Sequence, residues 1–181
     1  MSVEPVAVEL TAPRAADPRG RDGFEEFVNA TADRLYRSAL LMCGDHHLAE
    51  DLTQTTYARV YASWPKVAAA DSPLAYTRTI LTRTFLSHRR LKRTGEQPVD
   101  VLPDRPTQAP DLETRVDLLA ALRQLAPRDR AVLMLRYWED LSVADAATVL
   151  GIRETACRNR AARALARLRV LLPHLSEGDP S

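Results

Sequence analysis

The chain has 181 residues, 45% of them hydrophobic and 27% charged, so it can form one medium domain or two small ones. Aromatic residues make up only 6% and there are six glycines, which favours helices over a β-sandwich. The formal net charge of +1 hides a strong asymmetry along the chain, and no apolar stretch approaches the roughly 20 residues of a membrane span.

Residues 1–22 are rich in Pro, Ala and Asp without apolar periodicity, and we expect them to be a disordered tail. They also lack the basic and apolar regions of a secretory signal peptide. A cytoplasmic protein is therefore expected. Residues 176–181 are interpreted as a second tail.

Residues 23–94 are predicted to form a first module of three helices. The first helix follows an apolar pattern from Phe24 onward and is broken at Gly44. The second begins near Leu48, and Pro65 is expected to end it.

A third helix is predicted from Leu74 to about Arg93. Ser72 is a suitable N-cap for it, and Pro73 suits the first helical position, where no backbone donor is needed. We expect this helix to leave its arginines outside and to bury Leu74, Thr77, Leu81, Phe85 and Leu91.

Cysteines and histidines give no sign of a disulfide or a metal site. Cys43 and Cys157 lie far apart, each within a helical apolar pattern, so both are interpreted as core residues. His46 and His47 have no Cys or carboxylate at ligand spacing and are interpreted as a loop. We expect no metal and no other cofactor.

Residues 95–111 are predicted to be an interdomain linker. Four prolines forbid a continuous helix, and 17 residues span at most about 55 to 60 Å when extended. The expected fold is all-α, with two small helical domains joined by this Pro-rich linker.

Residues 112–175 are predicted to form the second module. A fourth helix opens the module and Pro127 begins a fifth. Ser142 and Asp145 then form a capping box for a short helix, and Gly151 permits the left-handed turn that ends it. A basic helix follows, and this order is typical of a helix-turn-helix.

The basic helix is predicted to read DNA. Arg158, Asn159 and Arg163 are donors on its outward side, and Arg pairs with guanine edges while Asn pairs with adenine. A generic αα-hairpin is the structural alternative. The inward side is expected to carry Ile152, Ala156 and Leu165.

Charge divides the chain into an acidic stretch and two basic stretches. Residues 22–56 hold seven acidic residues against two arginines, a local net charge of −5. Residues 72–94 hold no acid, and residues 153–169 hold only Glu154. Two basic surfaces indicate two contacts with a polyanion. Their basic residues are Arg78, Arg83, Arg89, Arg90, Lys92 and Arg93, then Arg153, Arg158, Arg160, Arg163, Arg167 and Arg169.

These features together resemble the extracytoplasmic-function class of RNA polymerase sigma factors, specifically its compact actinobacterial type. The resemblance covers about residues 24–175 and rests on three segments in the family's order. They are AEDLTQTTYARVY, SPLAYTRTILTRTFLSHRR and LAPRDRAVLMLRYWEDLSVADAATVLGI. It implies that residues 23–94 are sigma region 2, that residues 112–175 are sigma region 4, and that the chain directs promoter recognition, strand opening and transcription initiation.

The resemblance also implies three sets of contact residues. It assigns Glu50, Asp51 and Gln54 to binding the clamp of core RNA polymerase. Thr55 stands where the family often has Glu. The minus-10 element, with its flipped base, falls to the loop 66–73 and to Tyr76, Arg78, Arg83, His88, Arg89 and Arg90. The minus-35 element falls to Arg158, Asn159, Arg160, Ala162, Arg163 and Arg167.

One departure concerns the start of the basic helix. Arg153 stands where the family usually has a serine N-cap, and losing such a cap costs about 0.5 to 2 kcal/mol. The promoter sequence therefore does not follow from the resemblance.

Three other function classes fit this sequence less well than a sigma factor does. A stand-alone helix-turn-helix regulator would bind DNA by itself, usually as a dimer, which the acidic first module disfavours. An enzyme would need a convergent nucleophile, base or metal set, and the sequence offers none. A helical interaction module leaves the basic helix unexplained. The expected partners are core RNA polymerase and promoter DNA, with an anti-sigma factor as a candidate regulator of a chain that is monomeric when free.

Overall fold

The computed structural model describes residues 20–94 and 112–173, and all regular secondary structure in these two stretches is helical. The predicted linker and both predicted tails, apart from residues 20–22, lie outside them. The N-terminal module contains α1 (Arg21–Cys43), α2 (His46–Ala62), α3 (Trp64–Ala68) and α4 (Pro73–Thr94). The C-terminal module contains α5 (Leu112–Arg123), α6 (Pro127–Leu133), the π-helical turn η1 (Met134–Trp138), α7 (Val143–Leu150) and α8 (Glu154–Leu171).

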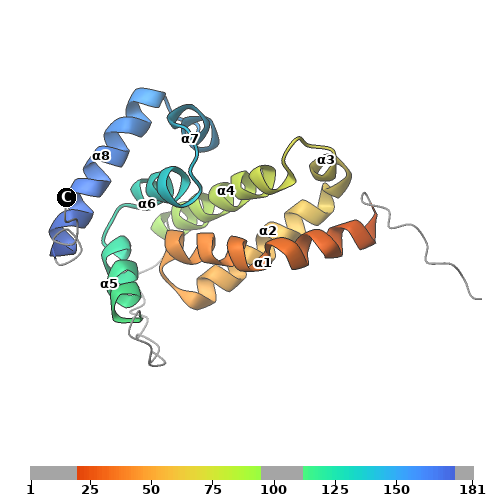
Figure 1. Cartoon of the computed structure of the whole chain (residues 1–181), viewed down its shortest axis with the longest axis horizontal. Coiled ribbons are helices and arrows are strands. Elements are labelled where there is room, and N and C mark those ends of the chain that lie inside the picture. Colours follow the sequence, from red (N-terminus) through yellow and green to blue (C-terminus); the bar gives the residue numbers. More distant parts are fainter. Residues whose placement is uncertain (1–19, 95–111, 174–181) are drawn as a thin grey trace, which may run out of the picture.

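The N-terminal module is built on α1, α2 and α4, which pack alongside one another (Figure 1). The predicted apolar positions Leu81 and Phe85 are fully buried between these helices, together with Leu35 and Leu52. At the far end Trp64 is buried against Phe24 and Phe27, and its indole Nε1 donates to Gly20 O at 3.1 Å. Helix α1 begins at Arg21, two residues before the predicted start of the module.

Three predictions for this module are wrong in detail. Helix α2 ends at Ala62, and Pro65 lies in the first turn of the extra helix α3, where proline needs no donor partner. That helix also takes up the start of the predicted loop 66–73. The histidines His46 and His47 begin α2, because Asp45 caps the helix by accepting a hydrogen bond from Leu48 N at 2.7 Å.

Buried hydroxyl groups of the N-terminal module find acceptors within their own helices. Each hydroxyl oxygen lies 2.6 to 3.0 Å from the carbonyl oxygen four residues earlier, and each threonine donates its proton to that carbonyl. These buried residues are Thr31, Ser38, Thr56, Thr77, Thr82 and Thr84.

In the C-terminal module, α6 widens into η1 before the chain turns toward α7. Glu139 N donates to Met134 O, five residues earlier, at 3.0 Å, and Asp140 has a left-handed φ of 52°. The wider turn sets the direction in which Trp138 and Glu139 leave the helix. Such π turns are common where a helix carries a specialised side chain.

The two modules share one hydrophobic core, which the sequence did not lead us to expect. Helix α6 lies between α8 and the N-terminal module (Figure 1), and it contacts α1 and α4. Ala131, Val132 and Leu135 are buried in the same cluster as Leu35 and Phe85. The linker therefore joins two modules that are packed together in this structure.

Candidate nucleic-acid interface

The helix-turn-helix is formed by α7, the turn at Gly151 and α8. Ser142 caps α7 by accepting from Asp145 N at 3.0 Å, and its hydroxyl donates to the Asp145 carboxylate at 2.6 Å. Gly151 has a left-handed φ of 63°, as predicted for the turn. Arg153 is the N-cap of α8 and provides no side-chain cap.

Helix α8 has one buried and one exposed side. Cys157, Ala161 and Ala164 are the buried residues, whereas the predicted inward positions Ile152 and Leu165 are half-buried. The residues predicted to read DNA are exposed, namely Arg158, Asn159, Ala162, Arg163 and Arg167.

Several arginines of α8 already have intramolecular partners. Arg158 Nη2 lies 3.1 Å from a carboxylate oxygen of Glu154, one turn earlier on the exposed surface. Arg160 Nη1 lies 2.8 Å from Asp129 Oδ1 of α6 and is half-buried, so this contact fixes α8 against α6. The exposed pair between Arg158 and Glu154 is weak, so Arg158 can readily exchange its carboxylate partner for a phosphate.

The predicted polymerase-binding residues lie together on α2. Glu50, Asp51 and Gln54 are all exposed, as is Thr55. Asp51 and Gln54 line a groove of about 380 Å³ between α2 and α4. An exposed surface with two carboxylates and an amide suits a partner surface rich in arginine.

The predicted minus-10 residues on α4 do not share one exposed surface. Arg83 and Arg90 are exposed, while His88 and Arg89 are half-buried. Tyr76 packs against the buried cluster around Trp64, so it is partly a core residue. The prediction that α4 leaves all its arginines outside is wrong, because the side chain of Arg78 is only 11% exposed.

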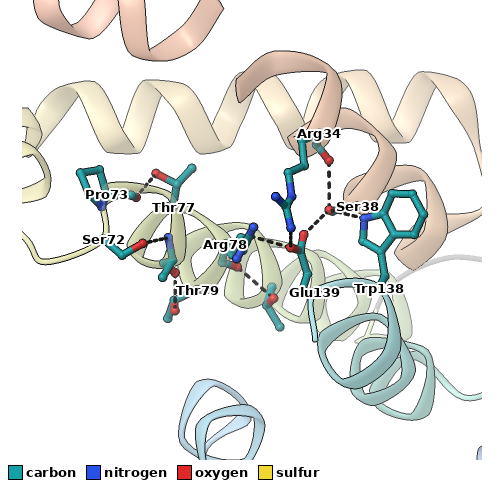
Figure 2. A network of polar contacts seen from close by, with 11 residues as sticks. Arg34, Ser38, Ser72, Pro73, Thr77, Arg78, Thr79, Trp138 and Glu139 are labelled. Atoms are coloured by element: carbon teal, nitrogen blue, oxygen red, sulfur yellow. Dashed lines mark hydrogen bonds and ion pairs between the residues drawn. The ribbon is translucent and has the colours of Figure 1, made fainter. Parts of the chain in front are cut away.

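Arg78 belongs to a polar cluster that joins the two modules, which we call the Glu139 cluster (Arg34, Ser38, Arg78, Trp138 and Glu139). Figure 2 shows Glu139 facing Arg34 and Arg78, with the Trp138 indole turned toward Ser38. The carboxylate of Glu139 has no exposed side-chain surface.

Every polar atom of that carboxylate has a partner from the N-terminal module. Glu139 Oε2 lies 2.8 Å from Arg78 Nε and 3.2 Å from Arg34 Nη2. Ser38 Oγ donates to Glu139 Oε1 at 2.6 Å and accepts from Trp138 Nε1 at 3.2 Å. Burial lowers the pKa of the Arg78 guanidinium, and Glu139 opposes that shift by favouring the charged form.

A second arginine crosses between the modules from α6. Arg130 is 1% exposed, donates to Cys43 O at the end of α1 at 3.2 Å, and lies 5.7 Å from the centre of the Phe85 ring. Burial, followed by the nearby Arg89, lowers its pKa to about 10, so it stays charged at neutral pH. The carbonyl end of α1 is a favourable place for a cation.

Sequence reasoning missed the contribution of Trp138 and Glu139. Trp138 ends the apolar run of the fifth predicted helix, and Glu139 follows it. Both stand in a segment that was used only for the resemblance, which assigned them no contact. A carboxylate in such a segment is normally a surface residue, so no signal in a single sequence identifies it.

Comparison with known proteins identifies both modules. The family model for Sigma-70 region 2 matches residues 27–94, and the model for Sigma-70, region 4 matches residues 115–168. The RNA polymerase sigma-E factor of Streptomyces coelicolor is 35% identical over 148 residues, which are 81% of this chain and 84% of that protein. The chain belongs to the sigma-70 family. It is an extracytoplasmic-function sigma factor, which binds RNA polymerase and directs promoter recognition.

Other comparisons agree with the family and the fold. The ECF RNA polymerase sigma factor SigE of Mycolicibacterium smegmatis is 32% identical over 181 residues, covering 93% of this sigma factor and 68% of that protein. A similar fold occurs in the sigma factor RpoE solved in complex with the anti-sigma factor NepR from Bartonella quintana. That match has a TM-score of 0.65 and 24% identity, and it covers 83% of this chain and 97% of that chain.

Within residues 20–94 and 112–173, no helix has the length and hydrophobicity to cross a membrane. In the same part of the chain, no group of three or more His, Cys, Asp or Glu residues is arranged to hold a metal ion.

Proposed function

We propose that the two modules divide the work of the sigma factor residue by residue, as the resemblance implied. Helix α2 docks on core polymerase through Glu50, Asp51 and Gln54. The α3–α4 loop and α4 bind the minus-10 element, and α8 reads the minus-35 element. The observation that carries this proposal is that the acidic face of α2 and the outer face of α8 are exposed on the same molecule.

In α8, the outward residues Arg158, Asn159 and Arg163 make the base contacts. They lie within about one turn of each other, so they can reach neighbouring base pairs from one position in the major groove. Arg167 lies further along the same exposed side and contacts phosphate. Arg160 reaches a phosphate only when its pair with Asp129 opens.

In α4, exposed arginines hold the phosphate backbone of the non-template strand while a base leaves the stack. Unstacking one base requires a few kcal/mol, which pocket contacts and aromatic stacking offset. Strand opening therefore uses binding free energy alone. We propose that the chain is not an enzyme and that it acts in the cytoplasm, where RNA polymerase transcribes.

We also propose that an anti-sigma factor regulates this chain. Support comes from the similar sigma factor that was solved with the anti-sigma factor NepR. Free of both polymerase and regulator, the chain is expected to be monomeric.

Run-off transcription tests this function. Sigma-free core polymerase is supplied with the full-length chain on fragments of its own genome, and discrete transcripts with a shared, spaced pair of upstream motifs are expected. Arg158→Ala should lower transcription about 10- to 100-fold, because a bidentate base contact contributes about 1–3 kcal/mol. Asp51→Ala should reduce transcription from every promoter by weakening the polymerase contact.

Two exposed residues outside the proposed contacts serve as matched controls. Asp33→Ala removes an exposed carboxylate of α1, and Arg128→Ala removes an exposed cation of α6. Both should transcribe as the unchanged chain does. If core polymerase gains no promoter activity while the chain alone binds DNA specifically, the stand-alone regulator is the better account.

A further inference from the structure

The Glu139 cluster lies at the point where the two modules meet over the start of α4. Arg34, Ser38 and Arg78 belong to the N-terminal module, whereas Trp138 and Glu139 follow α6 in the C-terminal module (Figure 2). All the contacts to the Glu139 carboxylate therefore cross between modules. If the modules separate, the Glu139 carboxylate and the Arg78 guanidinium return to water, whereas the Arg34 side chain is already 53% exposed.

The same packing covers part of the proposed minus-10 surface. A groove of about 480 Å³ has Asp71, Tyr76 and Thr79 on one side. Its other side is formed by Leu141, Asp145 and Thr148, from α7 and the turn before it. The C-terminal module thus stands opposite the α3–α4 loop, where the non-template strand would have to lie.

The C-terminal module also supplies negative charge to a basic helix. Helix α4 carries no acidic residue of its own, and Glu139 neutralises Arg78 at a distance of 2.8 Å. Asp145 adds a second carboxylate on the α7 side of the groove. These two carboxylates place negative charge beside α4, where DNA phosphates would otherwise lie.

The other two proposed contact surfaces are not covered in this arrangement. Glu50, Asp51 and Gln54 on α2 are exposed, and so are Arg158 and Arg163 on α8. We call the arrangement with packed modules the closed state. In this state the molecule can therefore bind polymerase and double-stranded DNA before it can bind an opened strand.

We propose that the Glu139 cluster is an autoinhibitory contact, which holds region 4 over the start of α4 and blocks the minus-10 strand until the modules separate. This inference rests on the proposed minus-10 role of α4. A buried ion pair gains little net free energy, since desolvation offsets the attraction. Opening by polymerase must therefore mainly offset the exposure of the apolar residues that the two modules share. Apparent affinity for the strand is reduced by the fraction of molecules that are closed.

Glu139→Gln in the full-length chain tests the proposal. The substitution keeps the shape of the side chain but leaves the buried Arg78 without its counter-charge, which favours the open form in which Arg78 is solvated. Glu25→Gln is the matched control, because it removes a carboxylate from an exposed ion pair with Arg21 on α1. Trp138→Phe, which removes the hydrogen bond to Ser38, is a second test variant should Glu139→Gln fail to fold by circular dichroism.

Two measurements are made on each free protein. Small-angle X-ray scattering should give a larger radius of gyration for Glu139→Gln than for Glu25→Gln. Fluorescence anisotropy uses a labelled non-template strand covering the minus-10 motif of a promoter mapped by run-off transcription. The affinity of the protein for this strand should rise about tenfold in Glu139→Gln. Binding of a double-stranded minus-35 fragment should not change.

An unchanged radius of gyration in folded Glu139→Gln and Trp138→Phe would overturn the proposal. So would expansion without tighter strand binding, since the cluster would then hold the modules together without blocking DNA. Failure of the unchanged chain to support promoter-specific transcription would instead reject the proposed function, and the scattering result would still decide whether the cluster closes the molecule.

Discussion

Gly44 is the residue at which the end of α1 depends on left-handed backbone geometry. Its φ is 71°, and an added Cβ would lie 2.6 Å from Cγ of Arg123 on α5. We predict that Gly44→Ala lowers the free energy of unfolding by about 1–2 kcal/mol from the backbone alone, with a further loss if Arg123 has to move. Urea denaturation followed by circular dichroism measures this loss.

Gly151 offers a matched comparison at the same backbone conformation. Its φ is 63°, and nothing lies within 4 Å of an added Cβ. Gly151→Ala should therefore show only the backbone part of the loss. A Gly44→Ala variant as stable as the unchanged chain would show that α1 can end without a left-handed residue.

At the scale of elements, the start of α8 is open to improvement. Its N-cap Arg153 makes no side-chain cap, whereas α7 is capped by Ser142. We predict that Arg153→Ser stabilises the chain by about 0.5–1 kcal/mol, because a serine hydroxyl accepts from an unpaired amide of the first turn. The midpoint of thermal unfolding should rise.

The converse substitution calibrates that effect. Ser142→Ala should destabilise the chain by about 1 kcal/mol, because Asp145 N loses its acceptor. If Arg153→Ser and Ser142→Ala both leave the midpoint unchanged, side-chain capping does not contribute to the stability of this helix-turn-helix.

Most elements were predictable because their signals are local. Apolar periodicity, the cap at Ser72 and the glycine at 151 each act within one or two turns, and the helices they predicted are confirmed. The prediction for Pro65 was wrong because proline also fits the first turn of a helix, here that of α3. The prediction for the histidines was wrong because the N-cap at Asp45 was not considered. The π turn depends on the packing of Trp138 and Glu139, which sequence periodicity does not report.

At the scale of the whole molecule, Cys43 provides a reporter of module separation. The thiol is 2% exposed, and burial is the main cause that raises its pKa to about 11. We predict slow alkylation by iodoacetamide at mildly alkaline pH, because reaction needs an exposed thiolate. Glu139→Gln should speed modification of Cys43 relative to Glu25→Gln, as measured by mass spectrometry of the peptides.

Cys157 is the internal control for that experiment. It is fully buried, and the charged groups that influence its pKa, Arg136, Arg158 and Glu154, all belong to the C-terminal module. Its modification rate should therefore change little when the modules separate. Equal acceleration of both cysteines would indicate general unfolding instead.

The packing of one module on the other lay beyond what the sequence could predict. Ala131, Val132 and Leu135 satisfy the ordinary apolar pattern of a helix, and that pattern does not distinguish burial within a module from burial between modules. Likewise, the basic residues of α4 were predicted from their charge, but Arg78 turned out to be paired with a residue 61 positions later. Only the three-dimensional arrangement separates Arg78 from the exposed Arg83.

The hydroxyl groups that bond within their own helices have a consequence for how the sigma factor can change shape. Since Thr77, Thr82 and Thr84 rely on carbonyl groups of α4 itself, no internal hydrogen bond of that helix has to be rebuilt when region 4 departs. Ser38 likewise keeps Arg34 O within reach at 3.0 Å. If the modules separate as proposed, α4 therefore moves as a preformed helix, and local rearrangement is expected only at the π turn, whose residues Trp138 and Glu139 lose their partners.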